Sequence, residues 1–387
     1  MITRRNTFAL GGAALGGAFG AAGLATPALA QTRNLANLPA TMIWSVYDVG
    51  STGYVEASAI SDALGRAHGT RVRLQPSGTS IGRILPLKQR RASHAWLANE
   101  LYFAAEGLYE YATPDWGPQD FRVLAGRKNA FSVVATRESG ITKPEDLRGK
   151  RMAWVPANSS VNIKVEPILA FAGLTLNDVQ IVQFPSYAAS LRALIEGRAD
   201  CAGAAPAAAV LRELEASPRG ISWVQLDPNN AEGWARAQRA VPFVEPFAET
   251  IGAGMSEQNP VNVMGYRYPM ITVNADAAEA EVYALMTAIT DSFDMFKDTN
   301  PIMPRWAMNL AGTPPMDAPF HEGAIRFLRE RNIWNADIQR WQDTTLTRLN
   351  TLRAAWAEFL PGARSQPAEA FAAAWTERRR AALATLG

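Results

Sequence analysis

The sequence predicts an α/β protein with two lobes and a helical C-terminal extension. Its 387 residues are too many for one small core and suit about two domains of ordinary size. Short runs rich in Val, Ile and aromatic residues alternate with stretches of helical periodicity, which is typical of parallel sheets covered by helices on both faces. The alternation occurs as two successive series, and we therefore expect one lobe from each.

The first series begins near residue 42. We expect a helix over residues 55–68, closed by Gly69, and a second helix that starts at Ile81. The strands of this series are expected at residues 42–47, 71–75, 94–98, 121–127 and 130–136. Strands that alternate with helices in this way predict a parallel sheet for the first lobe.

The second series gives the second lobe, with strands expected at residues 151–155, 179–184, 199–202 and 221–226 and a helix that ends at Gly173. After Pro242 the chain becomes irregular, and we interpret that stretch as the return crossing to the first lobe. An apolar run over 263–273 and a long helix over 277–296 follow. The predicted boundaries are 31–137 with 270–333 for lobe one and 138–269 for lobe two.

The C-terminal segment, residues 334–387, differs from both series. Trp334, Trp341 and Trp356 recur at roughly helical spacing, and we expect a break at Pro361-Gly362 before a second helix over 368–386. We favour two amphipathic helices packed on a lobe. A docking surface for a partner is the alternative.

Residues 1–30 are predicted to be an export signal. Arg4 and Arg5 precede a mildly apolar run over 9–24, and Ala28-Leu29-Ala30 is a small-residue cleavage site. The arginine pair resembles a twin-arginine signal, although the general secretory route stays open. A transmembrane anchor is the alternative, but about 20 apolar residues are needed to span a bilayer. We therefore expect cleavage after Ala30 and a periplasmic protein.

The composition excludes several classes of protein. With 48% apolar and 19% charged residues the chain is not of the disordered class, and its single cysteine excludes a disulfide scaffold. One cysteine and three histidines argue against a zinc site. The 38 basic and 36 acidic residues nearly balance, so no strong field attracts nucleic acid. We expect no cofactor, no metal and no nucleic-acid partner.

Four loops follow predicted strands and precede predicted helices, at residues 47–54, 76–80, 97–100 and 156–162. Each is rich in Gly, Ser, Thr or Asn, whose small side chains let the backbone N–H groups at a helix start approach an anion. Tyr47 and Tyr187 lie near loop ends and are candidates for the walls of a pocket. For any single loop, ordinary helix capping is the simpler interpretation.

One of these loops matches the pattern of a serine hydrolase. Gly78-Thr79-Ser80-Ile81-Gly82 fits G-x-S-x-G between a strand and a helix. Only one strand precedes it, however, and no His-Gly-Gly-Gly loop is present. Catalysis by Ser80 is therefore kept only as an alternative, and no complete nucleotide, dinucleotide or zinc-protease motif is found.

At several of these motifs the chain resembles the TAXI-type extracytoplasmic solute receptors of tripartite ATP-independent periplasmic (TRAP) transporters. The resemblance rests on Gly50-Ser51-Thr52-Gly53-Tyr54, on Pro76-Ser77-Gly78-Thr79-Ser80, and on Ser139-Gly140-Ile141 followed by Leu147-Arg148-Gly149-Lys150-Arg151. It covers roughly residues 43–333. The last of these motifs is shared widely among two-lobed binding proteins, so it indicates the fold rather than the branch.

The resemblance implies a type II-like periplasmic binding fold that closes on a small organic anion and delivers it to TRAP membrane subunits. It places ligand contacts at Ser51, Thr52, Tyr54, Ser77, Thr79, Ser80, Asn99, Asn158, Ser159, Ser160 and Asn162, with Tyr47 and Tyr187 beside them. The chain departs from the family at Asp48, which would repel an anion if it faced the cleft, at the loop 158–160, which replaces a Gly-rich turn, and at the extension 334–387.

Three hypotheses of function follow from the sequence. The first is a periplasmic receptor for a small carboxylate or amino-acid-like anion, with an ABC-transporter receptor as its nearest rival. The second is a secreted hydrolase that uses Ser80. The third is an interaction module whose working part is the Trp-rich tail.

Overall fold

The computed structural model describes residues 35–156, 158–241 and 243–386. Residues 32–387 cluster as one compact unit, and the description concerns that unit. The predicted export signal at residues 1–30 lies outside the described residues. No helix within the described ranges is long and apolar enough to span a membrane.

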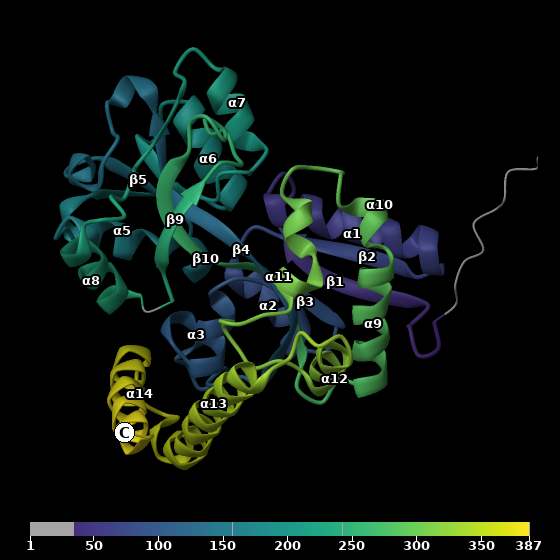
Figure 1. Cartoon of the computed structure of the whole chain (residues 1–387). Helices are drawn as coiled ribbons and strands as arrows, with labels where there is room; N and C mark the ends of the chain where they lie inside the picture. The colour runs from purple at the N-terminus through teal and green to yellow at the C-terminus, as the bar shows by residue number, and fades with distance from the viewer. Residues whose placement is uncertain (1–34, 157, 242, 387) are drawn as a thin grey trace, which may run out of the picture. The chain divides into compact units, whose positions relative to one another are not determined.

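The two-lobed α/β fold expected from the sequence is confirmed, and both lobes share one ten-stranded sheet (Figure 1). Its main order is β2-β1-β3-β10-β4-β7-β5-β6, with β8 paired to β4 and β9 paired to β10. The short strands are β1 (Thr41–Tyr47), β2 (Arg71–Ser77), β3 (His94–Leu97), β5 (Arg151–Trp154), β6 (Gln180–Gln183), β7 (Cys201–Ala204), β8 (Ile221–Trp223) and β9 (Glu245–Glu249). Strand β1 pairs in parallel with β2 and β3, and β5 pairs in parallel with β6 and β7, as the alternating pattern predicts. Strands β8 and β9 instead pair antiparallel with β4 and β10.

Two long antiparallel strands, β4 (Phe121–Thr136) and β10 (Val261–Asn274), pass through both lobes. The prediction of separate strands at 121–127 and 130–136 was wrong, because the intervening residues continue the pairing: Lys128 faces Arg267 and Asn129 faces Tyr266. The return crossing was also placed wrongly. It is made by the apolar run within β10 rather than by the irregular stretch before it, which instead contains the edge strand β9.

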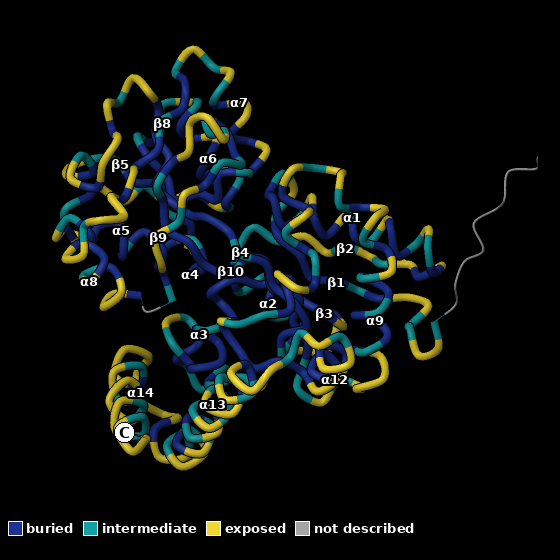
Figure 2. Tube along the Cα trace, viewed as in Figure 1, coloured by how far each residue is buried: buried dark blue, intermediate teal, exposed yellow. Residues whose placement is uncertain are grey.

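Helices cover the strands of each lobe, and several begin at a Ser or Thr whose side chain accepts a backbone N–H. Lobe one carries α1 (Thr52–His68), α2 (Ser80–Lys88), α3 (Glu100–Glu106), α9 (Glu279–Asp291), α10 (Phe293–Phe296), α11 (Met308–Ala311) and α12 (Glu322–Glu330). Lobe two carries α4 (Ser159–Asn162), α5 (Val165–Phe171), α6 (Tyr187–Ile195), α7 (Val210–Ala216) and α8 (Ala231–Ala240). In Figure 2 the inner strands such as β3, β4, β7 and β10 are largely buried, whereas the edge strands β2, β6 and β9 and the outer helix faces are more exposed.

A buried ion pair joins helix α1 to the crossing strand β4. Glu56 and Arg127 are both fully buried, and two guanidinium nitrogens of Arg127 donate to the Glu56 carboxylate. Trp306 Nε1 donates to the same carboxylate at 2.6 Å. Three donors therefore compensate one buried charge, which is the condition under which a buried ion pair is tolerated.

The C-terminal extension consists of α13 (Ala336–Ala363) and α14 (Ala368–Leu383), packed as a pair against lobe one (Figure 1). The expected break at Pro361-Gly362 was wrong, since α13 includes both residues. Pro361 lies in the last turn, so the clash and lost hydrogen bond that a proline brings fall close to where the helix ends anyway.

The extension is anchored on α3. Glu106, at the end of α3 and 1% exposed, accepts hydrogen bonds from Arg348 of α13 and Arg379 of α14. Trp375 is fully buried and donates from Nε1 to the carbonyl of Gly107 at 2.8 Å. Much of α14 is otherwise exposed, as the yellow tube in Figure 2 shows.

Candidate functional site

A cavity lies between the two lobes, where the carboxyl ends of the first strands of each lobe face one another. It encloses about 350 Å³ of empty space, part of it open to solvent. Both lobes and both crossing strands contribute to its wall, so its shape depends on how the lobes are closed. It is lined by Tyr47, Asp48, Arg83, Phe131, Asn158, Ser160, Val161, Lys164, Tyr187, Ala205, Tyr266 and Tyr268.

Lys164 is the one lining cation that has no acidic partner among the described residues. It precedes α5, is 2% exposed, and makes no side-chain hydrogen bond or ion pair within the described ranges. Its ammonium lies over the rings of Phe131 and Tyr266, 4.8 and 4.2 Å from their centroids. Burial lowers the pKa of Lys164 to about 7, against the attraction of Glu100 and Asp317. An anion in the cavity would restore the charged form.

Arg83, the other lining cation near this point, is already paired. Its Nε and Nη2 donate to Glu100 Oε1 at 3.0 and 2.9 Å, and both side chains are almost fully buried. The Tyr47 hydroxyl donates to the same oxygen at 3.0 Å, and the guanidinium lies 4.0 Å from the centre of the Tyr47 ring. Burial alone would raise the pKa of Glu100, but Arg83 and further donors hold it below its usual value. This cluster orients Tyr47 toward the cavity.

Aromatic rings form much of the remaining wall. Tyr266 and Tyr268 stack at 5.8 Å, and Tyr47 meets Tyr268 edge-on at 4.8 Å. Tyr266 and Tyr268 lie two residues apart on β10, so their side chains share one face of the strand. The Tyr187 hydroxyl accepts from Ala205 N at 3.1 Å, and burial raises its pKa to about 12. The wall offers flat apolar surface with hydroxyl groups at its edges.

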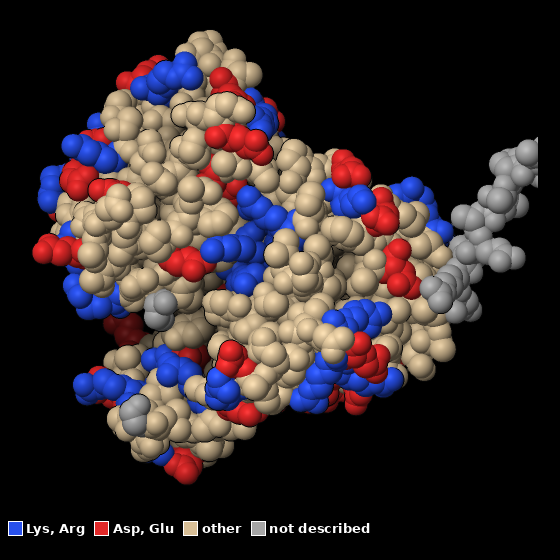
Figure 3. All heavy atoms as spheres, in the orientation of Figure 1, with Lys and Arg blue, Asp and Glu red and all other residues tan. Residues whose placement is uncertain are grey.

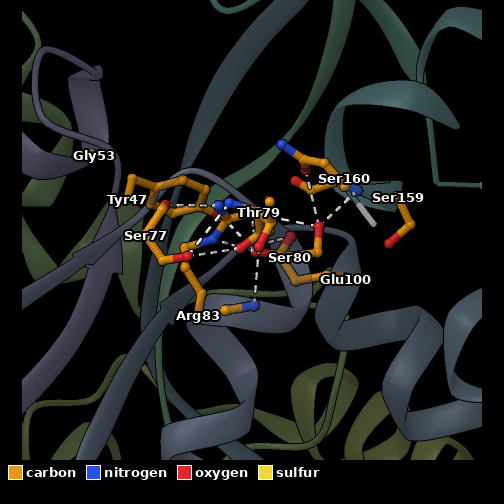
Figure 4. A network of polar contacts seen from close by, with 12 residues as sticks. Tyr47, Gly53, Ser77, Thr79, Ser80, Arg83, Glu100, Ser159 and Ser160 are labelled. Atoms are coloured by element: carbon orange, nitrogen blue, oxygen red, sulfur yellow. Dashed lines mark hydrogen bonds and ion pairs between the residues drawn. The ribbon is translucent and has the colours of Figure 1, made fainter. Parts of the chain in front are cut away.

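Three residues predicted to bind the ligand, two of which line the cavity, also contact one another across the cleft. The Ser80 hydroxyl donates to Asn158 Oδ1 at 2.9 Å and accepts from Ser160 N at 3.1 Å, while Asn158 Nδ2 donates to Gly78 O at 3.1 Å. Figure 4 shows Ser80 of lobe one directed at Ser160 in the facing loop. We call this set of four residues the interlobe clasp. It holds the lobes closed by direct contacts.

Asp48 lines the cavity, where its negative charge would repel an anion. Its carboxylate, however, already accepts a hydrogen bond from the opposite lobe. Asp48 Oδ2 accepts from Ala188 N at 3.3 Å, in the first turn of α6 in the opposite lobe. Free N–H groups at a helix start favour a carboxylate there. Asp48 therefore adds a second contact between the lobes.

The remaining predicted residues lie next to the cavity without lining it. Ser51 and Thr79 cap α1 and α2, and Ser77 contacts the backbone of Thr79. Asn162 bonds Val155 N and O and so shapes its own loop. The other four, Thr52, Tyr54, Asn99 and Ser159, also lie outside the wall. The ordinary capping interpretation describes Ser51 and Thr79, whereas Thr52 Oγ1, Asn99 Oδ1 and Ser159 Oγ are buried and have no hydrogen-bond partner among the described residues.

The environment of Ser80 does not favour a hydrolase. Its hydroxyl is fully buried, donates to an amide oxygen, and has Arg83 Nη2 at 3.5 Å. A nucleophilic serine needs an adjacent general base. No histidine of the described residues bonds it, and His321, the late histidine of the sequence, caps α12.

Sequence reasoning missed Lys164, Phe131, Tyr266 and Tyr268. A signal existed for the two tyrosines, because Tyr at alternate positions of an apolar strand places both rings on one face. Lys164 carried no such signal, because nothing in the sequence shows which of 38 basic residues loses its solvent on folding.

Comparison with protein families places most of the chain: residues 48–331 match the sequence model of the NMT1-like family. The C-terminal extension lies beyond the matched residues. Comparison with curated proteins gave no match.

Solved structures similar to the chain include the alkanesulfonate-binding protein SsuA from Xanthomonas axonopodis pv. citri bound to MOPS, at 16% identity over 82% of this chain and 94% of that chain, with a TM-score of 0.40. The periplasmic aliphatic sulphonate binding protein SsuA from Escherichia coli is 13% identical over 82% and 88%, with a TM-score of 0.42. The amino acid ABC transporter substrate-binding protein AbpA from Streptococcus pneumoniae, bound to L-arginine, is 10% identical over 70% and 94%, with a TM-score of 0.38. Such distant similarity carries no information about the ligand.

Proposed function

The chain belongs to the NMT1-like family, and we propose that it is a periplasmic solute-binding protein that closes its two lobes on a small organic anion. The observation that carries the proposal is Lys164, a buried cation without an acidic partner in a cavity between two lobes. A buried charge is costly unless it is compensated, so the site favours a ligand that brings the missing negative charge. A carboxylate and a sulfonate both satisfy this requirement.

The two lobes supply the mechanism of capture. Residues of the wall come from both lobes, so a bound solute contacts both at once and favours the closed arrangement. The interlobe clasp and Asp48 contribute direct contacts that stabilise the same arrangement. Only contacts that differ between open and closed states shift the equilibrium, and the contacts of a solute held between residues of both lobes are of this kind.

Delivery to a membrane transporter is the second part of the proposal. Of the two transporter types weighed from the sequence, we propose an ABC transporter in preference to a TRAP transporter, since the family match is to NMT1-like proteins and not to TAXI receptors. Membership of the TAXI family and the TRAP subunits as partners remain predictions. Uptake by membrane vesicles with the protein added would decide: ATP dependence supports the ABC type, and dependence on an ion gradient supports the TRAP type.

The ligand class can be tested directly on the purified mature chain from Gln31. Native mass spectrometry, followed by denaturation, identifies any bound small molecule, and calorimetry then measures affinities for pentanoate, benzoate and butanesulfonate. We expect one-to-one binding of an organic anion and a loss of at least about tenfold in affinity in Lys164→Met, since a hydrogen bond to a charged group contributes about 1.5–3 kcal/mol.

The matched control is Lys143→Met, which removes an exposed lysine of lobe two. Its affinity should equal that of the wild type. Equal affinity of Lys164→Met and the wild type, or preference for neutral solutes, would contradict the proposal. Turnover of a chromogenic ester that is lost in Ser80→Ala would instead support the hydrolase.

A further inference from the structure

A second cavity lies beside the first, on the other side of Tyr266, which lines both. It contains about 990 Å³ of empty space, part of it open solvent. Lobe one, lobe two and β10 all contribute to its wall. Figure 3 shows Lys and Arg side chains gathered between the lobes on the face drawn there. It is lined by Tyr102, Gln238, Phe243, Val244, Glu245, Tyr266, Arg267, Pro315, Met316 and Asp317.

Asp317 is the acid of this wall that forms no ion pair within the described residues. It is 8% exposed, and its single hydrogen bond among the described residues comes from Asn99 Nδ2 to Oδ2 at 3.0 Å. The other oxygen, Oδ1, receives no donor. Asn99 Oδ1 beside it is also buried and has no hydrogen-bond partner. Asn99 Oδ1 is therefore a buried acceptor without a donor, which costs free energy, and Asp317 Oδ1 is open to a further donor.

The cation of this cavity, Arg267, does not fill that need. Its guanidinium donates to the carbonyl oxygens of Gly126, Leu310 and Pro314 at 3.2 to 3.3 Å. The other acid of the wall, Glu245, is half exposed and pairs with Lys128. The wall therefore has its basic group engaged with the main chain and one acid, Asp317, available.

Aromatic rings flank the available acid. Tyr102 and Phe243, one from each lobe, meet edge-on at 5.5 Å, and Tyr266 separates this space from the one that holds Lys164. Ring faces attract cations, and the attraction is stronger where water is excluded. A primary ammonium group combines three donors with a positive charge, and so suits both the rings and the acceptors.

We propose that this second cavity is a subsite for an ammonium or similar N–H-rich cationic group, with Asp317 as its counter-ion. The inference rests on the proposed function and deepens it: the solute carries an anionic group at Lys164 and a cationic group at Asp317, on either side of the Tyr266 ring. A solute with only the anionic group would leave the buried Asp317 carboxylate without a counter-ion.

The environment of Asp317 makes the subsite sensitive to pH. Burial raises the pKa of Asp317 to about 7, opposed by the Asn99 hydrogen bond and by Lys164 and Arg267 and reinforced by Glu100. A bound cation favours the ionised carboxylate. The increase in affinity that an amine group brings should therefore be greatest at pH 8 and should decline as the pH falls through 7.

The test compares three probes by calorimetry at pH 8: 4-(aminomethyl)benzoate, 4-methylbenzoate and 4-methylbenzylamine. The first two differ only in replacing a methyl by an aminomethyl group. We expect 4-(aminomethyl)benzoate to bind at least tenfold more tightly than 4-methylbenzoate. Asp317→Asn, which can still accept the bond from Asn99, should abolish the difference, while the control Glu245→Gln should preserve it.

Each result decides between the two proposals. If 4-methylbenzoate binds through Lys164 and the amine adds nothing, or if the gain survives in Asp317→Asn, the subsite is overturned and the anion-binding function stands. If 4-methylbenzylamine alone binds, and loses affinity in Asp317→Asn, the subsite stands and the anion-binding function falls. If none of the three binds at millimolar concentration, both are overturned.

Discussion

The Ser80 hydroxyl donates a hydrogen bond to the Asn158 side-chain oxygen at 2.9 Å, joining residues 78 positions apart in opposite lobes. Both residues belong to loops whose composition predicts contact with an anion. In the closed structure they bond to one another, while Lys164 is the lining cation without an acidic partner among the described residues. Ser80, which does not line the cavity, can therefore be altered without removing the cation that we assign to the ligand.

Ser80→Ala should weaken closure without touching Lys164. It removes one donor and one acceptor of the interlobe clasp, each worth about 0.5–1.5 kcal/mol, so the closed population and the apparent affinity should fall by at least about fivefold. Small-angle scattering of the unliganded protein measures the opening as an increased radius of gyration. Ser61→Ala, which removes only a local bond on exposed α1, should change neither quantity.

Lys164 and Asp317 should together lower the stability of the unliganded protein near pH 7. Burial lowers the pKa of Lys164 to about 7 and raises that of Asp317 to about 7. Between about pH 7 and 10.5 the folded chain binds fewer protons at Lys164 than the unfolded chain does. Between about pH 4 and 7 the folded chain binds more protons at Asp317 than the unfolded chain does. Ionisation of Asp317 should thus lower the free energy of unfolding as the pH rises to 7. Deprotonation of Lys164 should raise the free energy of unfolding above pH 7.

Urea unfolding at pH 5, 7 and 9 separates these contributions. The free energy of unfolding of Lys164→Met, relative to the wild type, should show its largest gain at pH 7 and below and shrink toward pH 9. The corresponding gain of Asp317→Asn should be small at pH 5 and larger at pH 7 and 9. A constant difference at all three pH values in either variant would contradict its assigned pKa.

Removing one partner of the buried ion pair should be severe. Arg127→Met leaves the Glu56 carboxylate fully buried with Trp306 as its remaining donor, and loss of one partner of a buried pair costs about 3–5 kcal/mol. Thermal unfolding should show a large drop in melting temperature. The double variant Glu56→Leu/Arg127→Met removes both charges and should recover much of the loss. A double variant as unstable as the single would contradict this explanation.

The extension should stabilise lobe one through Trp375. Trp375→Ala removes a fully buried ring and its bond to Gly107, and such truncations cost about 3–5 kcal/mol. Trp375→Phe retains most of the apolar contact and should cost clearly less. If the extension were only a docking surface for a partner, neither variant would change the melting temperature of the isolated protein.

The layout of the lobes was predictable from the sequence because apolar residues recur with different periods in strands and in helices. The strand that starts near residue 42 and the capped helix after Ser51 lie where this pattern indicates. The continuity of β4 was not predictable, since Arg127, Lys128 and Asn129 interrupt an apolar run. The structure shows why they are tolerated: Arg127 is neutralised by Glu56, and Lys128 reaches Glu245 at the surface.

The candidate site was only partly predictable. Loop composition led to Tyr47, Asn158, Ser160 and Tyr187, all of which line the cavity. Composition does not distinguish a side chain that will contact a ligand from one that will bond the opposite lobe, because both roles suit small polar residues. Ser80 was therefore assigned to the ligand, while Lys164 went unnoticed.

The strand β10 lies between β3 and β4 in the sheet, although it is built from residues that come more than 120 positions after β4 in the chain. Until Val261–Asn274 has been synthesised, the first three strands of lobe one have no connection to β4, and the pairing partner of β4 along most of its length is missing. Pairing between segments so distant in the chain forms late and slowly. The two lobes therefore do not mature one after the other during synthesis, and a nascent chain that ends before residue 261 keeps a long unpaired edge that chaperones must protect.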